Sequence, residues 1–535
     1  MKERFNGSHM LLLQYLKRDW KKLLLWILCV TLFSVGFIPS FKEMSEDKAL
    51  LGLYETFQNP AMISMVGPTP INSGSDYTLG ALYAQEMLLF CALLALILSV
   101  LHVVGHTRKE EESGLTELVR SYQIGRQANS LAVIVEMLVV NVLIALLSTL
   151  IIVSYQMDTI SVKGAIIFGI TIGMAGMFGT SIALVMAQLM PTSSSANGLS
   201  LGIIGILYII RAGTDVSNKD YSMINPLGWA YLTYPFTDNN WSPIIYNLIL
   251  CILLIFIAMM LENSRDMGSS FIPERKGKAH ASKFLMSIPG IFFKITKGLI
   301  FWWLLTFILM GAAYGSIYGD MQDFLENNKM MQQMFASKDH SLEVSFTSTI
   351  MVVLISLVTI LPMILVNKLY SEEKQLHFTQ IYATHVLRSK VYWTGIITAI
   401  LSGLLGIVVT TLGLGLVAQA SMKHNSDLAL MDFITAGYND LPFVVLFIGI
   451  TALALGWAPK FGKYAYAYLI YTFVIDYFGN LLDFPEWLEH TSVLNWLPQM
   501  PKDEFEVMPF TIIMIISIVL IVLGYIGYRR RDLIG

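Results

Sequence analysis

The sequence predicts an all-α polytopic membrane protein of about twelve transmembrane helices, arranged as two parallel six-helix repeats. Three observations predict this class. The 535 residues have a mean hydropathy of +0.62, and only 14% of them are charged, against roughly 25% in soluble domains. Apolar runs of about 17 to 27 residues recur along the chain, and a helix needs roughly 20 residues to cross the hydrocarbon core. A charged motif also occurs twice, in the two halves of the sequence.

The apolar runs place the crossings in order along the chain. They lie near residues 23–39, 79–105, 129–153, 163–190, 197–213, 243–262, 297–317, 344–368, 391–418, 442–457, 464–481 and 509–528. Transmembrane strands do not fit these runs, because barrel strands are about ten residues long and alternate in polarity. The polar, basic segment 263–293 is the predicted cytoplasmic linker between a first six-helix half, 1–262, and a second, 294–535.

Basic residues predict the orientation of the crossings. They cluster before the first crossing and after the second, sixth and twelfth: Lys17, Arg18, Lys21, Lys22, Arg108, Lys109, Arg120, Arg126, Arg265, Arg275, Lys276, Lys278, Arg529, Arg530 and Arg531. The positive-inside rule makes this side cytoplasmic, and the opposite loops 41–78 and 318–343 are acidic or neutral. We therefore expect both termini in the cytoplasm. GSHM at residues 7–10 is compatible with either a vector-derived or a native sequence.

The two charged stretches are RKEEESGLTELVRSYQIGR at 108–126 and YSEEKQLHFTQIYATHVLR at 370–388. An offset of 262 residues (372 − 110) sets the Glu-Glu pair of the first on that of the second, and the final arginines align as well. After the sixth and twelfth crossings, Arg265 and Arg531 align at nearly the same spacing (531 − 265 = 266). These matches predict two parallel copies of one unit, related by an axis along the membrane normal.

Each charged stretch lies in the predicted cytoplasmic connection between the second and third crossings of its half. In the first stretch, Leu115, Leu118, Val119 and Tyr122 fall at helical spacing, so one face of a short helix can dock on a partner. The alternative interpretation is a solvated amphipathic turn, repeated only because the unit was duplicated.

Taken with SRDMGSSFIP in the linker, INPLGWAYLTYPFTDNNWSPI at 224–244 and the terminal YRRRDLIG, these stretches resemble the ABC-2 type permeases of the tetronasin and narasin exporter group, which export polyketide antibiotics. The resemblance covers essentially the whole chain. It implies that 108–126 and 370–388 are coupling helices, each seated in a cleft of a cytoplasmic ATPase subunit.

Residue by residue, the resemblance implies a set of ATPase-coupling positions in the two stretches: Glu110, Glu111, Gly114, Arg126, Glu372, Glu373 and Arg388. The second stretch departs from the pattern, because Leu376 stands in place of the glycine and His377 follows it. We therefore expect the two coupling sites to be unequal.

By the same resemblance, the chain would be the permease subunit of an ATP-driven exporter in the bacterial plasma membrane. Its substrate would be a hydrophobic or amphipathic antibiotic such as a polyketide ionophore. No G-x-x-x-x-G-K-[ST], HExxH or CxxC motif occurs, so we assign no catalytic residue, metal or cofactor, and expect a separate ATPase dimer to bind ATP and Mg²⁺. A net charge of −3 without a basic, aromatic-rich stripe suggests no nucleic-acid partner.

Two other functions fit the same features. A secondary multidrug transporter with six-plus-six parallel repeats would need no ATPase and would leave the paired glutamates without a function. A non-transporting antibiotic sensor built on a permease fold is the third possibility.

Four ionisable side chains within the crossings are candidates for functional sites, because each costs about 2.5 to 3.5 kcal/mol at mid-helix. Arg211 and Asp476 hold nearly equivalent places in crossings five and eleven and are candidates for an outer latch between the halves; extension of the two side chains to the membrane interface is the alternative. For Glu86 and Glu136, in crossings two and three, we favour an interhelical hydrogen bond or a wet cavity over proton coupling.

Two further expectations concern the membrane interior. We expect no relay of acids and histidines, with His102 and His106 solvated at the cytoplasmic interface. Gly169 with Gly173, and Gly198 with Gly202, are spaced GxxxG and predict close helix packing in crossings four and five.

Overall fold

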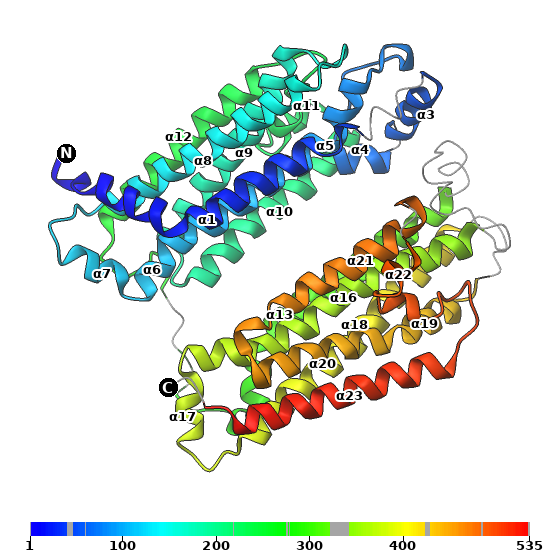
Figure 1. Ribbon diagram of the computed structural model, residues 1–535. Coiled ribbons are helices and arrows are strands. Elements are labelled where there is room, and N and C mark those ends of the chain that lie inside the picture. Colours follow the sequence, from blue (N-terminus) through cyan, green and yellow to red (C-terminus); the bar gives the residue numbers. More distant parts are fainter. Residues whose placement is uncertain are drawn as a thin grey trace. The chain divides into compact units, whose positions relative to one another are not determined.

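The computed structural model describes residues 2–39, 47–58, 60–217, 219–273, 277, 279–320, 342–422, 428–482 and 485–532 (Figure 1). Within these ranges the chain forms helices and no β-strand, so the predicted all-α class is confirmed. Most of the predicted outer loop 318–343 lies outside the described residues. The described chain divides into two compact units, 1–276 and 277–535, with the boundary inside the segment 263–293.

Among the described residues, ten helical stretches are long and apolar enough to cross a membrane. They are Leu79–Glu112, Ala128–Ser154, Val162–Leu189, Ser193–Ser217, Ser242–Ser264, Ile288–Gly319, Glu343–Lys374, Arg388–Ser421, Leu430–Trp457 and Val507–Arg530. The other two predicted crossings are also helices, α1 (Ser8–Val35) and α21 (Tyr464–Leu482). They are less apolar, because α1 carries a charged segment at residues 17–22 and α21 is rich in tyrosine. The protein is a multi-pass membrane protein.

Unit 1 is a bundle of six long helices with shorter ones at its ends. The long helices are α1, α5 (Leu79–His106), α8 (Ala128–Ser154), α9 (Val162–Leu189), α10 (Ser193–Ser217) and α12 (Ser242–Ser264). The short ones are α3 (Asp47–Phe57), α4 (Pro60–Val66), α6 (Arg108–Glu112), α7 (Leu115–Arg120) and α11 (Lys219–Ser222). Helix α9 lies at the centre and packs against α5, α8, α10 and α12. Its N-terminus is fixed by Ser161, whose side chain accepts a hydrogen bond from the backbone of Gly164.

Glycines explain the close packing of α9 on α8. A Cβ atom at Gly169 would lie 2.3 Å from Thr149 Oγ1, and one at Gly173 would lie 2.8 Å from the carbonyl oxygen of Asn141. The first GxxxG pair is therefore a packing seam, as predicted. The second pair, Gly198 and Gly202, does not form a packing seam with the described residues, because none of their atoms lies within 4 Å of a Cβ placed at either glycine.

Unit 2 has the long helices α13 (Ile288–Ser316), α16 (Leu342–Lys374), α18 (Arg388–Ser421), α20 (Leu441–Trp457), α21 and α23 (Val507–Arg530). The shorter helices are α17 (His377–Tyr382), α19 (Leu430–Asn439) and α22 (Glu486–Glu489). Helix α13 packs along α18 and α20 packs along α23. The second contact is so close that a Cβ atom at Gly456 would lie 2.1 Å from the carbonyl oxygen of Gly524.

The charged stretches occupy corresponding places in the two units. In unit 1, α6 and α7 connect α5 to α8 at the end of the bundle that carries the N-terminus (Figure 1). In unit 2, α17 connects α16 to α18 at the end where α23 finishes. Both stretches therefore stand at the end of a bundle, where Val119 in unit 1 and Phe378 in unit 2 attach them to the core.

Candidate functional site

A left-handed residue shapes the turn in each charged stretch. Gly114, between α6 and α7, has φ +74° and ψ 0°, a conformation that glycine adopts without steric cost. Leu376, between α16 and α17, has φ +63° and ψ +13°, although its Cβ makes this conformation cost roughly 1–2 kcal/mol. The second stretch departs from the glycine pattern in residue type and still makes the same turn.

The second glutamate of the first stretch is held by an arginine that follows α12. Arg265 donates from Nη1 and Nη2 to the two oxygens of Glu111, each at 2.7 Å, in the bidentate geometry that makes such pairs strong. Glu111 Oε1 also accepts from the backbone nitrogen of Gly268 at 2.7 Å, and its Oε2 from Arg108 Nη1 at 3.0 Å. The carboxylate therefore faces the interior of the protein, and its side chain is only 10% exposed.

The final arginine of the first stretch contacts the same segment. Arg126 Nη2 donates a hydrogen bond to the carbonyl oxygen of Arg265. Residues 111 and 126, at the two ends of the stretch, thus both bind the residue that follows α12. We call the set Glu111, Arg126 and Arg265 the clasp of unit 1.

Unit 2 contains an equivalent clasp, made of Glu373, Arg388 and Arg531. Arg531 Nη1 donates to Glu373 Oε1 at 2.6 Å and its Nη2 donates to Oε2. Arg388 Nη1 donates to the carbonyl oxygen of Arg531 at 2.8 Å. The same three residue types thus make the same contacts in both units. The spacing of Arg265 and Arg531 indicated the repeat but not that these two arginines belong to the site.

The first glutamates of the two stretches have different partners. Glu110 accepts from Arg18 Nη2 at 2.7 Å and from the hydroxyl of Tyr15 at 3.0 Å, which ties α6 to α1. Burial, reinforced by the charge of Glu110, raises the pKa of Tyr15, so its hydroxyl stays protonated as a donor. Glu372 instead bonds close by in sequence, to Lys368 Nζ at 2.7 Å and His377 Nδ1 at 2.6 Å.

The outer faces of the two stretches differ in polarity. Leu115, Leu118 and Tyr122 are 45%, 61% and 70% exposed, and together they form an apolar face on and after α7. Val119 is partly buried and packs on the core of unit 1. At the 262-residue offset, the corresponding positions carry His377, Gln380 and Thr384, which are also exposed. The exposed face of the charged stretch is therefore apolar in unit 1 and polar in unit 2.

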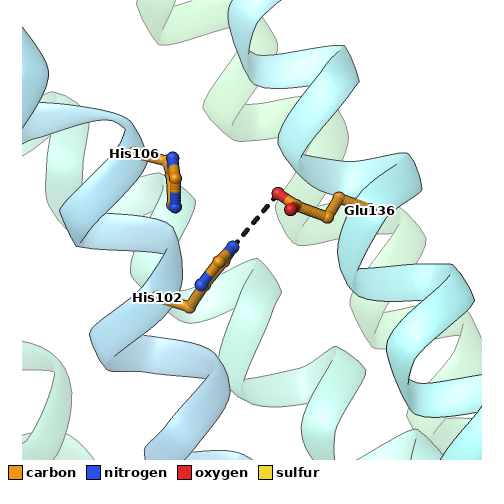
Figure 2. Close-up of side chains that lie close together, drawn as sticks. All are labelled: His102, His106 and Glu136. Carbon is orange, nitrogen blue, oxygen red and sulfur yellow. Dashed lines mark hydrogen bonds and ion pairs between the residues drawn. The ribbon is translucent and has the colours of Figure 1, made fainter. Parts of the chain in front are cut away.

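The two histidines of α5 are buried and interact with an acid on α8. His102 Nε2 lies 3.1 Å from Glu136 Oε2, and both side chains are fully buried (Figure 2). His106 is 4% exposed, and its ring centroid lies 4.2 Å from that of His102. The expectation that both histidines are solvated is wrong, because α1 covers them with the rings of Trp26 and Tyr15.

Two of the remaining intramembrane candidates, Arg211 and Asp476, have partners within their own units. Arg211 is fully buried; its Nη1 lies 3.2 Å from Asp215 Oδ2, and its Nη2 donates to the carbonyl oxygen of Ser64 at 2.6 Å. Asp476 accepts a hydrogen bond from the hydroxyl of Ser492. An Arg211–Asp476 pair between the halves stays a prediction. Glu86 is partly buried in α5.

Comparison with known proteins connects these features to transport. Residues 285–529 match the family described as multidrug efflux system permease Rv1217c, C-terminal domain. The chain is also 26% identical, over 536 residues, to the multidrug efflux system permease protein Rv1217c of Mycobacterium tuberculosis (strain ATCC 25618 / H37Rv); the alignment covers 99% of this chain and 95% of that protein. These similarities support a membrane permease, and membership of the tetronasin and narasin group stays a prediction.

Proposed function

We propose that this chain is the membrane subunit of an ATP-driven exporter in the bacterial plasma membrane. In this proposal the stretches 108–126 and 370–388 dock a separate cytoplasmic ATPase dimer, which binds ATP and Mg²⁺. The observation that carries the proposal is the clasp, which equivalent residues form in both units and which holds a short exposed helix at the end of each bundle. The similarity to a multidrug efflux system permease supports transport as the task.

The energetics of the clasp favour a mechanical role. A six-residue helix such as α7 or α17 is too short to be stable alone in water, so its orientation depends on the contacts around it. A buried ion pair adds little net stability over apolar packing, but loss of one partner is costly. The clasp therefore fixes the position of each stretch relative to the end of α12 in unit 1 or of α23 in unit 2, which suits a segment that receives force from a partner.

The exposed faces favour a protein partner. Protein interfaces contain aromatic and apolar anchors at their centre, and Leu115, Leu118 and Tyr122 supply such a group on the predicted cytoplasmic side. The sequence contains no phosphate-binding loop of its own, so the energy for export would come from that partner. The polar face at 377–384 would bind the ATPase dimer less tightly, or bind a different subunit.

A hydrophobic or amphipathic antibiotic is the proposed substrate class. The support is the efflux function in the name of the similar protein, together with the resemblance of the charged stretches to permeases that export polyketides. The basic residues at the α6 end of unit 1 support a cytoplasmic location for that end and for both termini.

The test is a detergent pull-down of the chain from its native membranes, with mass spectrometry of the soluble proteins that accompany it. Wild type should recover an ABC-type ATPase. Leu118→Asp should reduce the recovered ATPase at least tenfold, because it places a charge at the centre of the apolar face. Leu118→Met, which keeps the face apolar, is the matched control, and Gln380→Asp tests the polar face of unit 2.

Transport of labelled drug into inverted vesicles separates the three candidate functions. Drug uptake that requires ATP, and that falls in Leu118→Asp but not in Leu118→Met, would support the exporter. Uptake by a chain that purifies without an ATPase would favour the secondary transporter. No uptake under either condition, with drug binding retained, would favour the sensor.

A further inference from the structure

We propose that His102, His106 and Glu136 form a binding site for one divalent transition-metal ion of the zinc class. His102 and His106 lie four residues apart on one face of α5, and Glu136 lies on the neighbouring helix α8. The three side chains point toward one another (Figure 2). One ligand atom from each lies within 4.8 Å of the other two.

The distances match a metal site that needs only a small adjustment. Zinc binds histidine nitrogen and carboxylate oxygen at about 2.0–2.2 Å in a tetrahedron, which separates the ligand atoms by roughly 3.3 Å. His102 Nε2 and Glu136 Oε2 are already 3.1 Å apart. The ring of His106 would move by roughly 1–1.5 Å, which rotation about its side-chain bonds provides.

Two buried polar atoms of the cluster lack a partner, and one of them, on Glu136, points independently to a ligand. His102 Nδ1 and Glu136 Oε1 have no hydrogen-bond partner among the described residues, although both side chains are fully buried. Buried polar atoms are nearly always paired. With His102 Nε2 as the ligand, a bound ion and the water on its open position would give Glu136 Oε1 a partner, whereas His102 Nδ1 would keep its present surroundings.

The surroundings of His106 supply a second layer of carboxylates. Asp19 Oδ2 lies 3.3 Å from His106 Nε2, and Glu110 Oε1 lies 3.4 Å from His106 Nδ1. A histidine that binds metal through Nε2 commonly donates its Nδ1–H to such a carboxylate. Metal binding through Nε2 would replace the Asp19 contact, and protonated Nδ1 would donate to Glu110 in place of accepting from Arg18 Nη2, now 2.5 Å away; Arg18 would keep its 2.7 Å bond to Glu110.

The ligand set selects the class of ion. Two imidazoles and one carboxylate suit zinc, cobalt and nickel, whereas magnesium and calcium prefer oxygen ligands alone. Three protein ligands would leave one position for water. Because the site bridges α5 and α8 close to α6, a bound ion would stabilise the end of unit 1 that carries the charged stretch.

The experiment is a titration of the full chain with Co²⁺, in detergent and without a polyhistidine tag, followed by the visible absorption of tetrahedral cobalt. We expect one cobalt per chain, displaced by Zn²⁺. His102→Gln and Glu136→Gln should each weaken binding at least tenfold. His385→Gln, which changes an exposed histidine, and Glu86→Gln, which changes an acid of α5 outside the site, are matched controls that should bind as wild type does.

Two results of the titration would overturn the proposal: wild type that binds less than about one-fifth of an equivalent, or binding that both ligand variants retain at wild-type affinity. X-ray absorption of zinc-loaded wild type provides a measurement that does not depend on variants. It should report a nitrogen and oxygen shell with imidazole scattering, and a sulfur shell would place the ion on a cysteine and exclude this site.

Discussion

The replacement Glu111→Gln tests whether the clasp holds the charged stretch of unit 1 in place. Glutamine has nearly the same shape as glutamate but lacks the charge that Arg265 requires. Its amide also presents donors to a guanidinium that has only donors. We expect local opening of 108–126 to become easier without unfolding of the bundle, because the core helices α5, α8 and α9 pack against one another independently of this residue.

The contacts of Glu111 set the size of the effect. Removal of one member of a buried ion pair costs about 3–5 kcal/mol. The cost here should be smaller, because the two side chains are 10% and 9% exposed and Arg265 keeps its 2.6 Å bond to Gln188. The glutamine oxygen can also still accept from Gly268. We therefore expect about 2 kcal/mol, which corresponds to about a 30-fold change in the opening equilibrium.

Hydrogen exchange of the backbone amides measures this equilibrium directly, since exchange in a locally opening segment follows its opening free energy. Amides within 112–121 should exchange about 30-fold faster in Glu111→Gln than in wild type. Glu117→Gln changes an exposed acid of α7 in the same way and should alter exchange less than twofold. Glu373→Gln should accelerate exchange within 374–384 of unit 2 to a similar extent.

A double-mutant cycle gives the outcome that would refute the reasoning. If Glu111 and Arg265 act as a pair, Arg265→Met should add little to the effect of Glu111→Gln, with a coupling energy of about 2 kcal/mol. Additive effects, or equal exchange in Glu111→Gln and Glu117→Gln, would mean that the ion pair does not hold the stretch.

Three further groups of changes, at the two turns, at the helix contact in unit 2 and at Arg211, have defined expectations. Gly114→Ala should destabilise the turn between α6 and α7 by about 0.5–1 kcal/mol and so speed its amide exchange, because alanine places a Cβ in the left-handed region. Leu376→Gly removes such a Cβ and should slow exchange in the corresponding turn of unit 2 or leave it unchanged. Effects of the opposite sign would exclude backbone strain as the cause. Gly456→Ala should lower the stability of unit 2 by about 1–3 kcal/mol, because the added Cβ forces α20 away from α23. It should therefore lower the melting temperature, whereas Gly198→Ala should not. Equal melting temperatures for the two variants would contradict the observed packing. Arg211→Met should cost about 3–5 kcal/mol by leaving its aspartate partner unpaired, and an unchanged melting temperature would refute that role.

The positions of the crossings were largely predictable because the bilayer imposes a simple length and polarity on each. Their ends were not. Helix α13 begins at Ile288, before the predicted 297, because Ser287 accepts a hydrogen bond from the backbone of Gly290 and caps a turn outside the apolar run. Helix α16 likewise continues through charged residues to Lys374. Polarity marks where a helix leaves the membrane, and local capping decides where it ends.

The site was predictable in its residue types and not in its pairing. The repeat identified Glu111 and Glu373, but each is bound by an arginine more than 150 positions away in the sequence, and no local pattern indicates such a contact. The equal spacing of Arg265 and Arg531 was the available signal. The error at His102 has a similar origin, since the contact of Trp26 and Tyr15 of α1 with the histidines of α5 joins distant segments that no local pattern connects.

Helix α6 has only five residues, yet its side chains are bonded to three separate parts of unit 1. Glu110 contacts α1, Arg108 donates at 2.9 and 2.7 Å to the carbonyl oxygen of Pro191 between α9 and α10, and Glu111 binds the residue after α12. Helix α6 is therefore anchored rigidly to unit 1 at three separate points. A load applied there would be shared by several crossings at once, so the bundle would tilt as one body before any single helix bent.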